Sequence, residues 1–516
     1  MINKLQLFAL AITGTTLCAQ STPFPSANQK QQQAIDDTSI WSHFGGNTRR
    51  QSTANLASSI PSLASPTWIG SGDATNTYIP IAQSGLVVDH TQVYTLATNP
   101  AQPGSSLAVC YDRFTGGFNW ATPIPPAILD SWSTPTIDIQ HHQIIIAIGD
   151  RLLALDTKDG NKNWSTPIDG IVVNASPIVT ADLGNADRAF ITNYSFGGGT
   201  PSKLTCINID PFNASNNPYQ PGEIVWQTSL LGDSSGNTPA YANGMVYVST
   251  ASSPGSQAGQ VHAFDATATT APSPSWTFTN TINAGFFSGV SIERGHVYAS
   301  SYSFTGLQYS ANTVKLNKQT GALVWSVPTN RTDATPVILD NGDVVVSGGI
   351  ATGAFEFLPF FGTLPSIQYL DETNNIATVL WDSALDTLDD TNDNAIWDFG
   401  ESFLSLGGWT HQPIAYTINN TPMLLVGTLP QTTPGVLFGH NTALNLIDLT
   451  KLPTDTDFII EQYTGTGSTP AMVGSWIYAA GDDGVSGFAP LTPAQLISRY
   501  TKGQLTLGQL IKCLQR

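Results

Sequence analysis

An acidic segment between Trp381 and His411 has the residue types and spacing of a calcium-binding loop. Its twelve residues, 390–401, place oxygen groups at positions 1, 3, 5, 7, 9 and 12. These groups are the side chains of Asp390, Asn392, Asn394, Asp398 and Glu401 and the backbone carbonyl of Ile396. Calcium takes about six to eight oxygen ligands, and a terminal Glu can bind it through both oxygens. We expect a structural calcium site here, with a solvated acidic loop as the alternative.

One residue of this loop departs from the usual pattern. Ala395 stands where such loops carry a Gly at a sharp turn. An Ala in a left-handed backbone conformation costs about 1 kcal/mol. The substitution therefore weakens the predicted site without forbidding it.

Two other short patterns resemble catalytic motifs but lack the surroundings that catalysis needs. Residues 232–236, Gly-Asp-Ser-Ser-Gly, match the nucleophile elbow of serine hydrolases. That elbow requires a strand before it and a helix after it, whereas this segment runs directly into the strand expected at Pro239. His141 and His142 fall where a hairpin turn is expected and have no metal-ligand companion in the sequence, so we interpret them as a surface turn. The sequence therefore predicts no catalytic residue.

A repeated strand–turn–strand pattern holds these segments in place. It consists of a residue that is small in most copies, an apolar residue, Asp or Asn, two variable positions, Thr or Asp, Gly, three further residues and Trp. Three copies have the same spacing at every position and end at Trp120, Trp164 and Trp325. The Asp can bond to turn amides, the Gly supplies a positive φ, and the Trp packs between units. Stretched or degenerate copies start at Cys206, Ala263, Tyr369, Leu446 and Gly487.

A second marker precedes each copy and opens an alternating strand. It contains a Pro, which suits the first residue of a strand because no ladder donor is lost there. The eight places are taken by Pro80, Pro135, Pro177, Pro239, residues 288–290, Pro336, Pro413 and Pro470. Successive Trp residues lie 44 (120 to 164), 50 (226 to 276) and 49 (276 to 325) positions apart, which fits four short strands with their turns.

These counts predict an all-β fold, an eight-bladed β-propeller of four-stranded antiparallel blades over residues 65–490. The eighth unit ends near Pro490 without its last strand, and residues 65–70 have the pattern of that missing strand. We therefore expect the N-terminal strand to close the ring, which hides both open edges. The acidic loop then forms an insertion at residues 386–409.

The Asp-x-x-Thr-Gly-x-x-x-Trp turns resemble those of the pyrroloquinoline-quinone-repeat (quinoprotein alcohol dehydrogenase-like) β-propeller superfamily. This superfamily includes quinone enzymes and non-catalytic scaffolds of the BamB type. Residues 41–47 also resemble the lead-in of many exported members. The resemblance implies that an enzyme would carry adjacent cysteines over the quinone and a Glu, Asn and Asp set around a catalytic calcium. This chain has no Cys-Cys pair, and that set cannot be matched residue by residue. The resemblance therefore points to the BamB-like branch, without bound quinone.

The two ends of the chain differ from the repeat. Residues 1–19 have the features of a signal peptide, and residues 20–64 form a lead-in segment. Residues 491–516 contain two capping boxes, at Thr492 and Thr506, which predict a short helical tail. This basic tail is either a docking tail or a lid on the propeller. An apolar hairpin at residues 354–361 either packs back onto the propeller or binds a partner.

Composition limits the partners and the compartment. The formal net charge of −18 in 516 residues argues against nucleic acid. No segment after the signal peptide is long and apolar enough to span a membrane. Cys110 and Cys206 occupy equivalent positions on non-neighbouring units, so we expect no disulfide between them. We predict an exported protein of the periplasm, cell envelope or extracellular space, and a monomer.

Three functions remain open. The first is a non-enzymatic scaffold that binds a protein or a glycan in the cell envelope. The second is a quinone-dependent alcohol or sugar dehydrogenase, which a cluster of axial carboxylates beside a basic residue would favour. The third is a carbohydrate-binding or wall-associated structural protein, which exposed aromatic residues on one face would favour.

Overall fold

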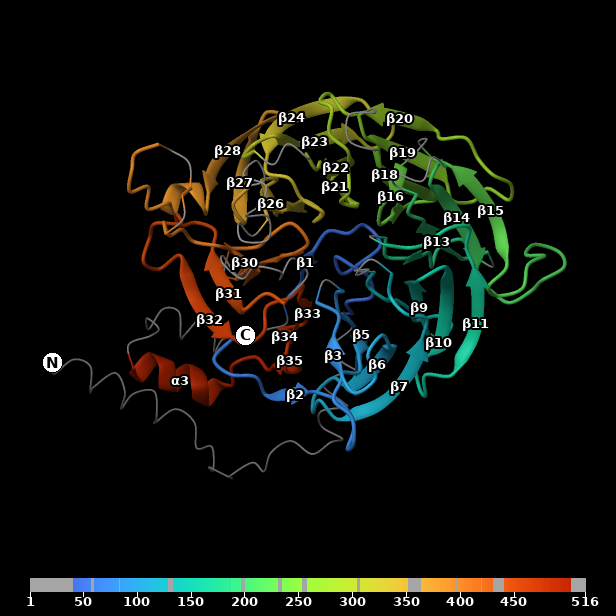
Figure 1. Ribbon diagram of the computed structural model, residues 1–516, viewed down its shortest axis with the longest axis horizontal. Coiled ribbons are helices and arrows are strands. Elements are labelled where there is room, and N and C mark those ends of the chain that lie inside the picture. Colours follow the sequence, from blue (N-terminus) through green and yellow to red (C-terminus); the bar gives the residue numbers. More distant parts are fainter. Residues whose placement is uncertain are drawn as a thin grey trace, which may run out of the picture. The chain divides into compact units, whose positions relative to one another are not determined.

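The computed structural model describes residues 40–56, 60–82, 84–128, 133–173, 175–184, 186–195, 200–230, 234–252, 258–303, 307–350, 363–394, 397–398, 400–418, 420–429 and 440–502. Its strands form eight sheets, which we number as blades 1 to 8 in chain order. Figure 1 shows the blades following one another around a common axis, from blue through green and yellow to red. The prediction of an eight-bladed propeller is therefore confirmed.

The first four blades run from the blue to the green part of Figure 1. Blade 1 contains β3 (Ile79–Pro80), β4 (Val87–Val88), β5 (Gln92–Thr98), β6 (Ser106–Asp112) and β7 (Phe118–Ile124). Blade 2 contains β8 (Thr136–Asp138), β9 (Gln143–Ile148), β10 (Arg151–Asp156) and β11 (Lys162–Pro167). Blade 3 contains β12 (Ile178–Val179), β13 (Arg188–Thr192), β14 (Lys203–Asn208) and β15 (Ile224–Ser229). Blade 4 contains β16 (Ser234–Gly236), β17 (Ala240–Ala242), β18 (Met245–Ser252), β19 (Gln260–Asp265) and β20 (Trp276–Thr279).

The last four blades complete the ring. Blade 5 contains β21 (Val290–Glu293), β22 (His296–Ser300), β23 (Ala311–Asn317) and β24 (Leu323–Thr329). Blade 6 contains β25 (Val337–Ile338), β26 (Val344–Gly348), β27 (Ser366–Thr373) and β28 (Ile376–Asp382), followed by the 3₁₀ helix η2 (Leu385–Thr387). Blade 7 contains β1 (Thr53–Ala54), β29 (Ile414–Ile418), β30 (Thr421–Thr428), β31 (Ala443–Asp448) and β32 (Ile459–Thr464). Blade 8 contains β33 (Ala471–Val473), β34 (Trp476–Gly481), β35 (Gly484–Phe488) and β2 (Trp68–Gly70).

Three blades depart from the expected four strands. In blades 1 and 4 the innermost strand is split in two, because β3 and β4 both pair with β5, and β16 and β17 both pair with β18. In blade 7 the innermost strand is β1, which comes from the N-terminal lead-in and pairs in parallel with β29. The lead-in is therefore part of the sheet structure, which the sequence did not predict.

The repeated turn works as the sequence predicts. In blade 1 the carboxylate of Asp112 accepts bonds from the Thr115 N–H at 2.8 Å and the Thr115 hydroxyl at 2.7 Å. Gly116 has a φ of 67° and lies under the ring of Trp68 from the preceding blade. A Cβ on Gly116 would come within 2.4 Å of that ring, so only Gly fits. The turn glycine thus serves both the turn and the packing of the neighbouring Trp.

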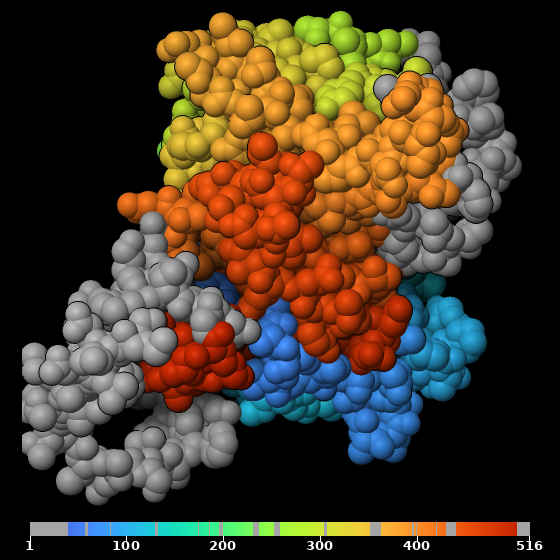
Figure 2. Space-filling model, turned by 90° about the vertical axis from the view of Figure 1, so that its left-hand side faces the viewer, coloured from blue at the N-terminus to red at the C-terminus, as the bar shows by residue number. Residues whose placement is uncertain are grey.

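The N-terminal strand closes the ring as predicted. β2 pairs antiparallel with β35, with Trp68 opposite Gly487. Figure 2 shows the blue N-terminal residues beside the red C-terminal ones on this side of the molecule. Arg113 of blade 1 is fully buried and donates from Nε to the Tyr478 hydroxyl of blade 8 at 2.9 Å. Blades 1 and 8 are therefore joined by backbone pairing and by a buried cation.

The C-terminal helix α3 (Pro493–Thr501) begins at the capping box predicted at Thr492. Its Leu496 is buried in a small cluster with Leu491, and the half-buried Ile60 and Tyr500 pack against them. Arg499 forms an ion pair with Glu461 of blade 7. Of the two alternatives for the tail, the part up to Lys502 therefore packs onto the propeller.

Within the part of the chain that the structure describes, no helix is long and apolar enough to cross a membrane. The signal peptide, the apolar hairpin at 354–361 and the second capping box at Thr506 lie outside the described residues.

Candidate functional site

The inner strands begin around the axis with a ring of small or polar residues, one from each blade. The members are Gly85, Thr134, Ser176, Thr238, Gly289, Thr335, Gln412 and Thr469, and all are buried. From blade 1 to blade 4, each backbone N–H donates to the side chain of the next member. These bonds run from Gly85 to Thr134 (2.8 Å), from Thr134 to Ser176 (2.9 Å) and from Ser176 to Thr238 (3.0 Å).

The remaining blades complete this axial ring. Gln412 accepts from the N–H and the hydroxyl of Thr335, at 2.8 Å each, and its own N–H donates to Thr469 at 3.3 Å. Two glycines fill the tightest places. A Cβ on Gly85 would lie 2.9 Å from Thr134 and 3.4 Å from Thr469, and one on Gly289 would lie 2.8 Å from the Thr238 carbonyl oxygen. At this level the inner strands of neighbouring blades are therefore in direct contact around the axis.

Six of the ring residues occupy one fixed position of the repeated sequence pattern. Thr134, Ser176, Thr238, Thr335, Gln412 and Thr469 are the residues directly before the six marker prolines. The recurrence of a polar residue directly before each of these prolines is the signal of the ring in the sequence, whereas the marker itself predicts only the start of a strand. In blade 1, Pro80 opens β3, but the ring position belongs to Gly85, just before β4.

The lead-in, which we define from here as residues 41–56, covers one mouth of the channel along the axis. It runs around the axis in the order of the blades and bonds to the inner strands three residues beyond the ring. Its partners are Val88 of blade 1, Ile137 of blade 2, Val179 of blade 3, Tyr241 of blade 4, Ile292 of blade 5 and Ala415 of blade 7. One segment of the chain thus satisfies inner-edge N–H groups of six blades.

Arg50 anchors the lead-in from within. Its side chain is fully buried, and its Nε donates to the Pro239 carbonyl at 2.9 Å. Its Nη1 donates to the Phe44 carbonyl at 2.6 Å, and its Nη2 to the Pro177 carbonyl at 3.1 Å. Burial lowers the pKa of Arg50 to about 9. Each of these partners is a backbone carbonyl, so the guanidinium serves to clamp chain segments together rather than to bind an acid.

His43 makes a second specific contact of the lead-in. Its Nε2 accepts from the Val179 N–H at 3.3 Å, so the proton of the neutral ring is on Nδ1, which lies 2.7 Å from the Ser42 hydroxyl. Burial, and then the charge of Arg50, hold the pKa of His43 well below 6.5. The neutral imidazole of His43 is therefore the form that fits at the mouth of the channel.

A second group of residues lies on the side of the ring opposite to the lead-in: Asp333 and Trp409 come shortly before ring residues of their blades, and Tyr302 packs with them. The Arg331 guanidinium lies over the Tyr302 ring at 5.4 Å, and Tyr302 contacts Trp409 at 5.9 Å between ring centroids. Asp333 donates from its backbone N–H to the Trp409 carbonyl at 2.7 Å. Burial raises the pKa of Asp333 to about 8, and the charge of Arg331 offsets part of that shift. Burial therefore favours the protonated form of this carboxyl.

The predicted calcium loop forms a hydrogen-bonded unit. Asp398 accepts from the side-chain amides of Asn392 at 2.6 Å and Asn394 at 2.8 Å. Asp390 accepts from the backbone N–H of Asn394 at 3.2 Å. Glu401 is buried and uses both oxygens, toward Thr391 and toward the Asp398 N–H. Five predicted ligand residues are thus close together, while Ile396 and Ala395 lie outside the described residues.

These carboxylates are bonded to amides rather than turned toward one point. Among the described residues, no three or more His, Cys, Asp or Glu side chains are grouped as a metal site. Rotation of the two Asn side chains about χ2 would present oxygen instead of nitrogen to the centre of the loop. The residues therefore have the right chemistry for calcium, and the loop would have to adjust to bind it.

His141 and His142 lie in the expected turn between β8 and β9, but the half-buried His141 side chain also contacts two carboxylates. Its Nδ1 lies 2.8 Å from the Asp138 carboxylate, and its Nε2 lies 2.9 Å from the Asp210 carboxylate of blade 3. The hydrogen bond with Asp138, more than any other interaction, raises the pKa of His141 above 6.5. Asp210 is 69 positions away, so sequence spacing gave no sign of it. His141 bridges two blades, while His142 is exposed in the same turn.

The remaining predicted features are placed as follows. Ser234–Gly236 form strand β16, and strand β17 follows, so no helix succeeds the elbow-like segment. Cys110 and Cys206 are both buried and free, as predicted. Burial raises the pKa of both thiols, which makes them poor nucleophiles.

The family model for the outer membrane protein assembly factor BamB matches residues 218–349. Among curated proteins, none has a sequence that matches this chain.

Solved structures share the fold at low sequence identity. A europium-containing methanol dehydrogenase is 10% identical, with 87% of this chain and 91% of that one covered and a TM-score of 0.54. The quinohemoprotein alcohol dehydrogenase from Comamonas testosteroni is 12% identical, with coverages of 95% and 88% and a TM-score of 0.54. BamB from Moraxella catarrhalis is 15% identical, with coverages of 83% and 98% and a TM-score of 0.48. The predicted resemblance is confirmed. A family model for an assembly factor and two structures of enzymes both match, so the comparisons do not select a function.

Proposed function

Since the chain is an eight-bladed propeller of the pyrroloquinoline-quinone-repeat type, we propose that it is an exported, non-enzymatic scaffold that binds a partner in the cell envelope. The observation that carries this proposal is the lead-in, which covers one mouth of the axial channel. The buried Arg50 clamp holds it there, and the inner strands of neighbouring blades contact each other around the axis. A propeller covered in this way offers its loops for binding.

The described surface has few exposed aromatic rings that could stack against a glycan. Phe212 is the one aromatic residue that is exposed among the described residues, with an exposed fraction of 50%. Glycan-binding faces present several aromatic rings, so this distribution does not support the carbohydrate-binding alternative.

Titration of pyrroloquinoline quinone into the purified mature protein tests this proposal. Calorimetry is carried out in the presence of calcium. We expect no heat of binding. One-to-one binding of the quinone would contradict the scaffold, and the next step would be a screen of alcohols and sugars with an artificial electron acceptor.

A quinone-dependent dehydrogenase remains the second candidate, and one observation favours it. Asp333 lies within the electrostatic influence of Arg331, and Tyr302 and Trp409 belong to the same group of residues. The described residues at this place offer a single carboxyl, whereas the resemblance implies a Glu, Asn and Asp set around a catalytic calcium. The group does not fit that set, so we assign Asp333 no catalytic step.

We also propose that residues 390–401 bind one calcium ion as a brace for the blade 6 insertion. Glu401, which is buried and uses both carboxylate oxygens, supports this proposal. Calcium is expected to raise the melting temperature of the protein, and magnesium to do so much less, because magnesium requires a tighter six-oxygen geometry. The variant Glu401→Gln should lose the calcium effect. Asp393→Asn, at a non-ligand position of the same loop, should keep it. An equal calcium response in Glu401→Gln would exclude this site.

A further inference from the structure

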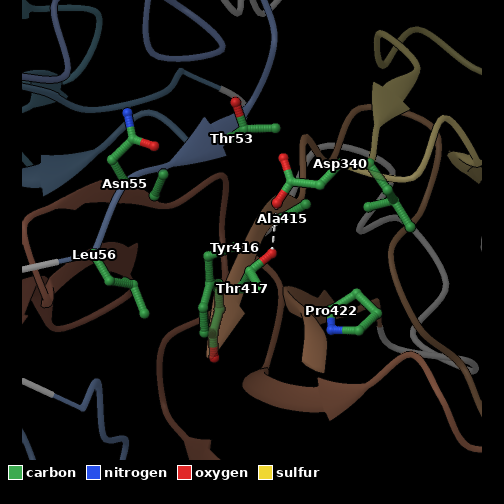
Figure 3. Close-up of a pocket in the computed structure, with 10 residues that line it drawn as sticks. Thr53, Asn55, Leu56, Asp340, Ala415, Tyr416, Thr417 and Pro422 are labelled. Atoms are coloured by element: carbon green, nitrogen blue, oxygen red, sulfur yellow. Dashed lines mark hydrogen bonds between the residues drawn. The ribbon is translucent and has the colours of Figure 1, made fainter. Parts of the chain in front are cut away.

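A small cavity opens where the lead-in passes blade 6. The lead-in bonds to blade 5 through Arg49 and to blade 7 through Ser52, and among the described residues it makes no backbone hydrogen bond to blade 6. The space left there has a volume of about 140 Å³. Its walls are residues 53–56 of the lead-in, 339–340 of blade 6, and 415–417 and Pro422 of blade 7. Figure 3 shows these three chain segments around the cavity.

The cavity contains one carboxylate held in a fixed direction. The Thr417 hydroxyl donates to Oδ2 of Asp340 at 2.7 Å. Figure 3 shows that bond as a dashed line, with the second oxygen of Asp340 directed to the side of Thr53. Within the described chain, no hydrogen bond to this second oxygen is recorded. One oxygen therefore positions the carboxylate, and the other is available for a ligand.

Neighbouring charges leave this site negative. Arg294 contacts the backbone carbonyl of Asp340, not its carboxylate. The Arg294 Nε also lies 3.8 Å from the Glu293 carboxylate, so these two charges offset each other. Asp340 then supplies the net charge at the cavity, in a protein whose overall formal charge is −18.

The size of the cavity and the groups that line it indicate the class of ligand that fits. Pockets for drug-sized ligands measure roughly 300–1,000 Å³, so this cavity suits only a small molecule. Asp340, Thr53 and Asn55 line the cavity, the first and last of them exposed, and each carries an oxygen acceptor, the kind of group that a primary ammonium group with its three N–H donors needs. Leu56, Leu339 and Pro422 provide apolar surface for a short alkyl chain. We propose that this cavity binds a small primary amine, with its ammonium group on Asp340.

Binding at this place would be coupled to the lead-in. Residues 53–56 form one wall, so the complete site exists only while the lead-in lies in the channel mouth. A ligand that binds this state alone stabilises it by mass action. The amine should therefore protect the lead-in as well as fill the cavity. This inference is independent of the scaffold proposal.

The test uses n-butylammonium chloride as the probe and the whole mature protein. Melting temperature and hydrogen exchange of residues 53–56 are measured with increasing probe, at constant ionic strength. We expect a higher melting temperature and slower exchange, and no effect of n-butanol, which has the same alkyl chain without charge. Asp340→Asn should weaken the response roughly tenfold, because it removes the charge-assisted hydrogen bond.

Two further variants make the outcome decisive. Asn55→Ala removes another acceptor and should also weaken the response, whereas Asp371→Asn, an exposed acid elsewhere in blade 6, should not. An unchanged response in both Asp340→Asn and Asn55→Ala would overturn the proposal. So would the absence of any response in the wild-type protein, or an equal response to n-butanol. A failure of the scaffold proposal would appear instead as quinone binding, which this experiment does not measure.

Discussion

Arg50 shows how a single residue can fix a long segment that has little regular structure. A buried guanidinium needs all its donors satisfied, and here backbone carbonyls from the lead-in and from blades 3 and 4 supply the acceptors. Arg suits this role better than Lys because its donors form a rigid planar fork.

The variant Arg50→Met tests that role. It keeps a long apolar side chain and removes the donors, so buried carbonyls lose their partners. We expect a loss of roughly 3 kcal/mol in the free energy of unfolding. Urea denaturation measures this loss. Arg49→Met, at the exposed neighbouring position, is the control and should change stability little. Equal effects of both variants would show that Arg50 is not the clamp.

His141 should make stability depend on pH with a defined sign. Its folded pKa is raised, chiefly by its hydrogen bond with Asp138, so the folded state holds the proton more tightly than the unfolded state. The stabilisation is fully present below the unfolded pKa of about 6.5 and is lost as pH rises through the folded pKa.

Melting curves from about pH 5 to about pH 9 measure this effect. The difference in melting temperature between the wild-type protein and His141→Gln should be largest at the acid end and shrink toward the alkaline end. His142→Gln, in the same turn, is the control. A difference that grows with pH would mean that the two aspartates do not hold a charged His141.

At the scale of elements, the turn glycine and the Trp of the preceding blade form one packing unit. This unit recurs because it needs only local sequence: Asp for the turn amides, Gly for the positive φ, and Trp at a fixed distance. The first position of the repeat, which holds a small residue in most copies, is filled differently in one blade. Lys315 takes the place of a small residue in blade 5 and forms a buried ion pair with Glu372 of blade 6.

Strand β2 should be critical for ring closure. The variant Trp68→Ala removes a side chain that covers Gly116 and lies opposite Gly487. We expect a loss of about 4 kcal/mol in the free energy of unfolding, from the cavity and from weaker closure. Ile69→Ala changes the next residue of the same strand, which is 45% exposed, and should cost far less. Similar losses for the two variants in urea denaturation would argue against closure through Trp68.

At the scale of the whole molecule, the axial ring links all eight blades. Its two glycines mark places where neighbouring blades come too close for any side chain. A Cβ on Gly289 would lie 2.8 Å from a backbone oxygen, which cannot move aside as a flexible side chain could.

The variant Gly289→Ala should therefore destabilise the protein by about 2 kcal/mol through overpacking. Gly117→Ala is the control, since the nearest atom to its Cβ would be a Thr115 side-chain oxygen at 3.3 Å. Urea denaturation measures both variants. A neutral Gly289→Ala would show that the blades can separate at the axis, and it would reopen the question of an axial ligand.

The propeller fold, the number of blades and the closing strand could all be predicted from the sequence. These features depend on short-range turn chemistry that repeats along the chain, so eight copies of one pattern are visible without any structure. The capping box at Thr492 was predictable for the same reason, because its two hydrogen bonds join residues three positions apart.

The contacts of the lead-in and of the bridging side chains can be seen only in the folded structure. The lead-in has no repeat or period, and its partners lie far away: His43 meets Val179 across 136 positions, and Arg50 meets Pro239 across 189. His141 found its second carboxylate only when blades 2 and 3 came together. Such contacts depend on which surfaces lie side by side in the folded propeller, and the local sequence does not predict them. The axial ring lies between the two cases, since the sequence showed its residues and the closed propeller gave them their contacts.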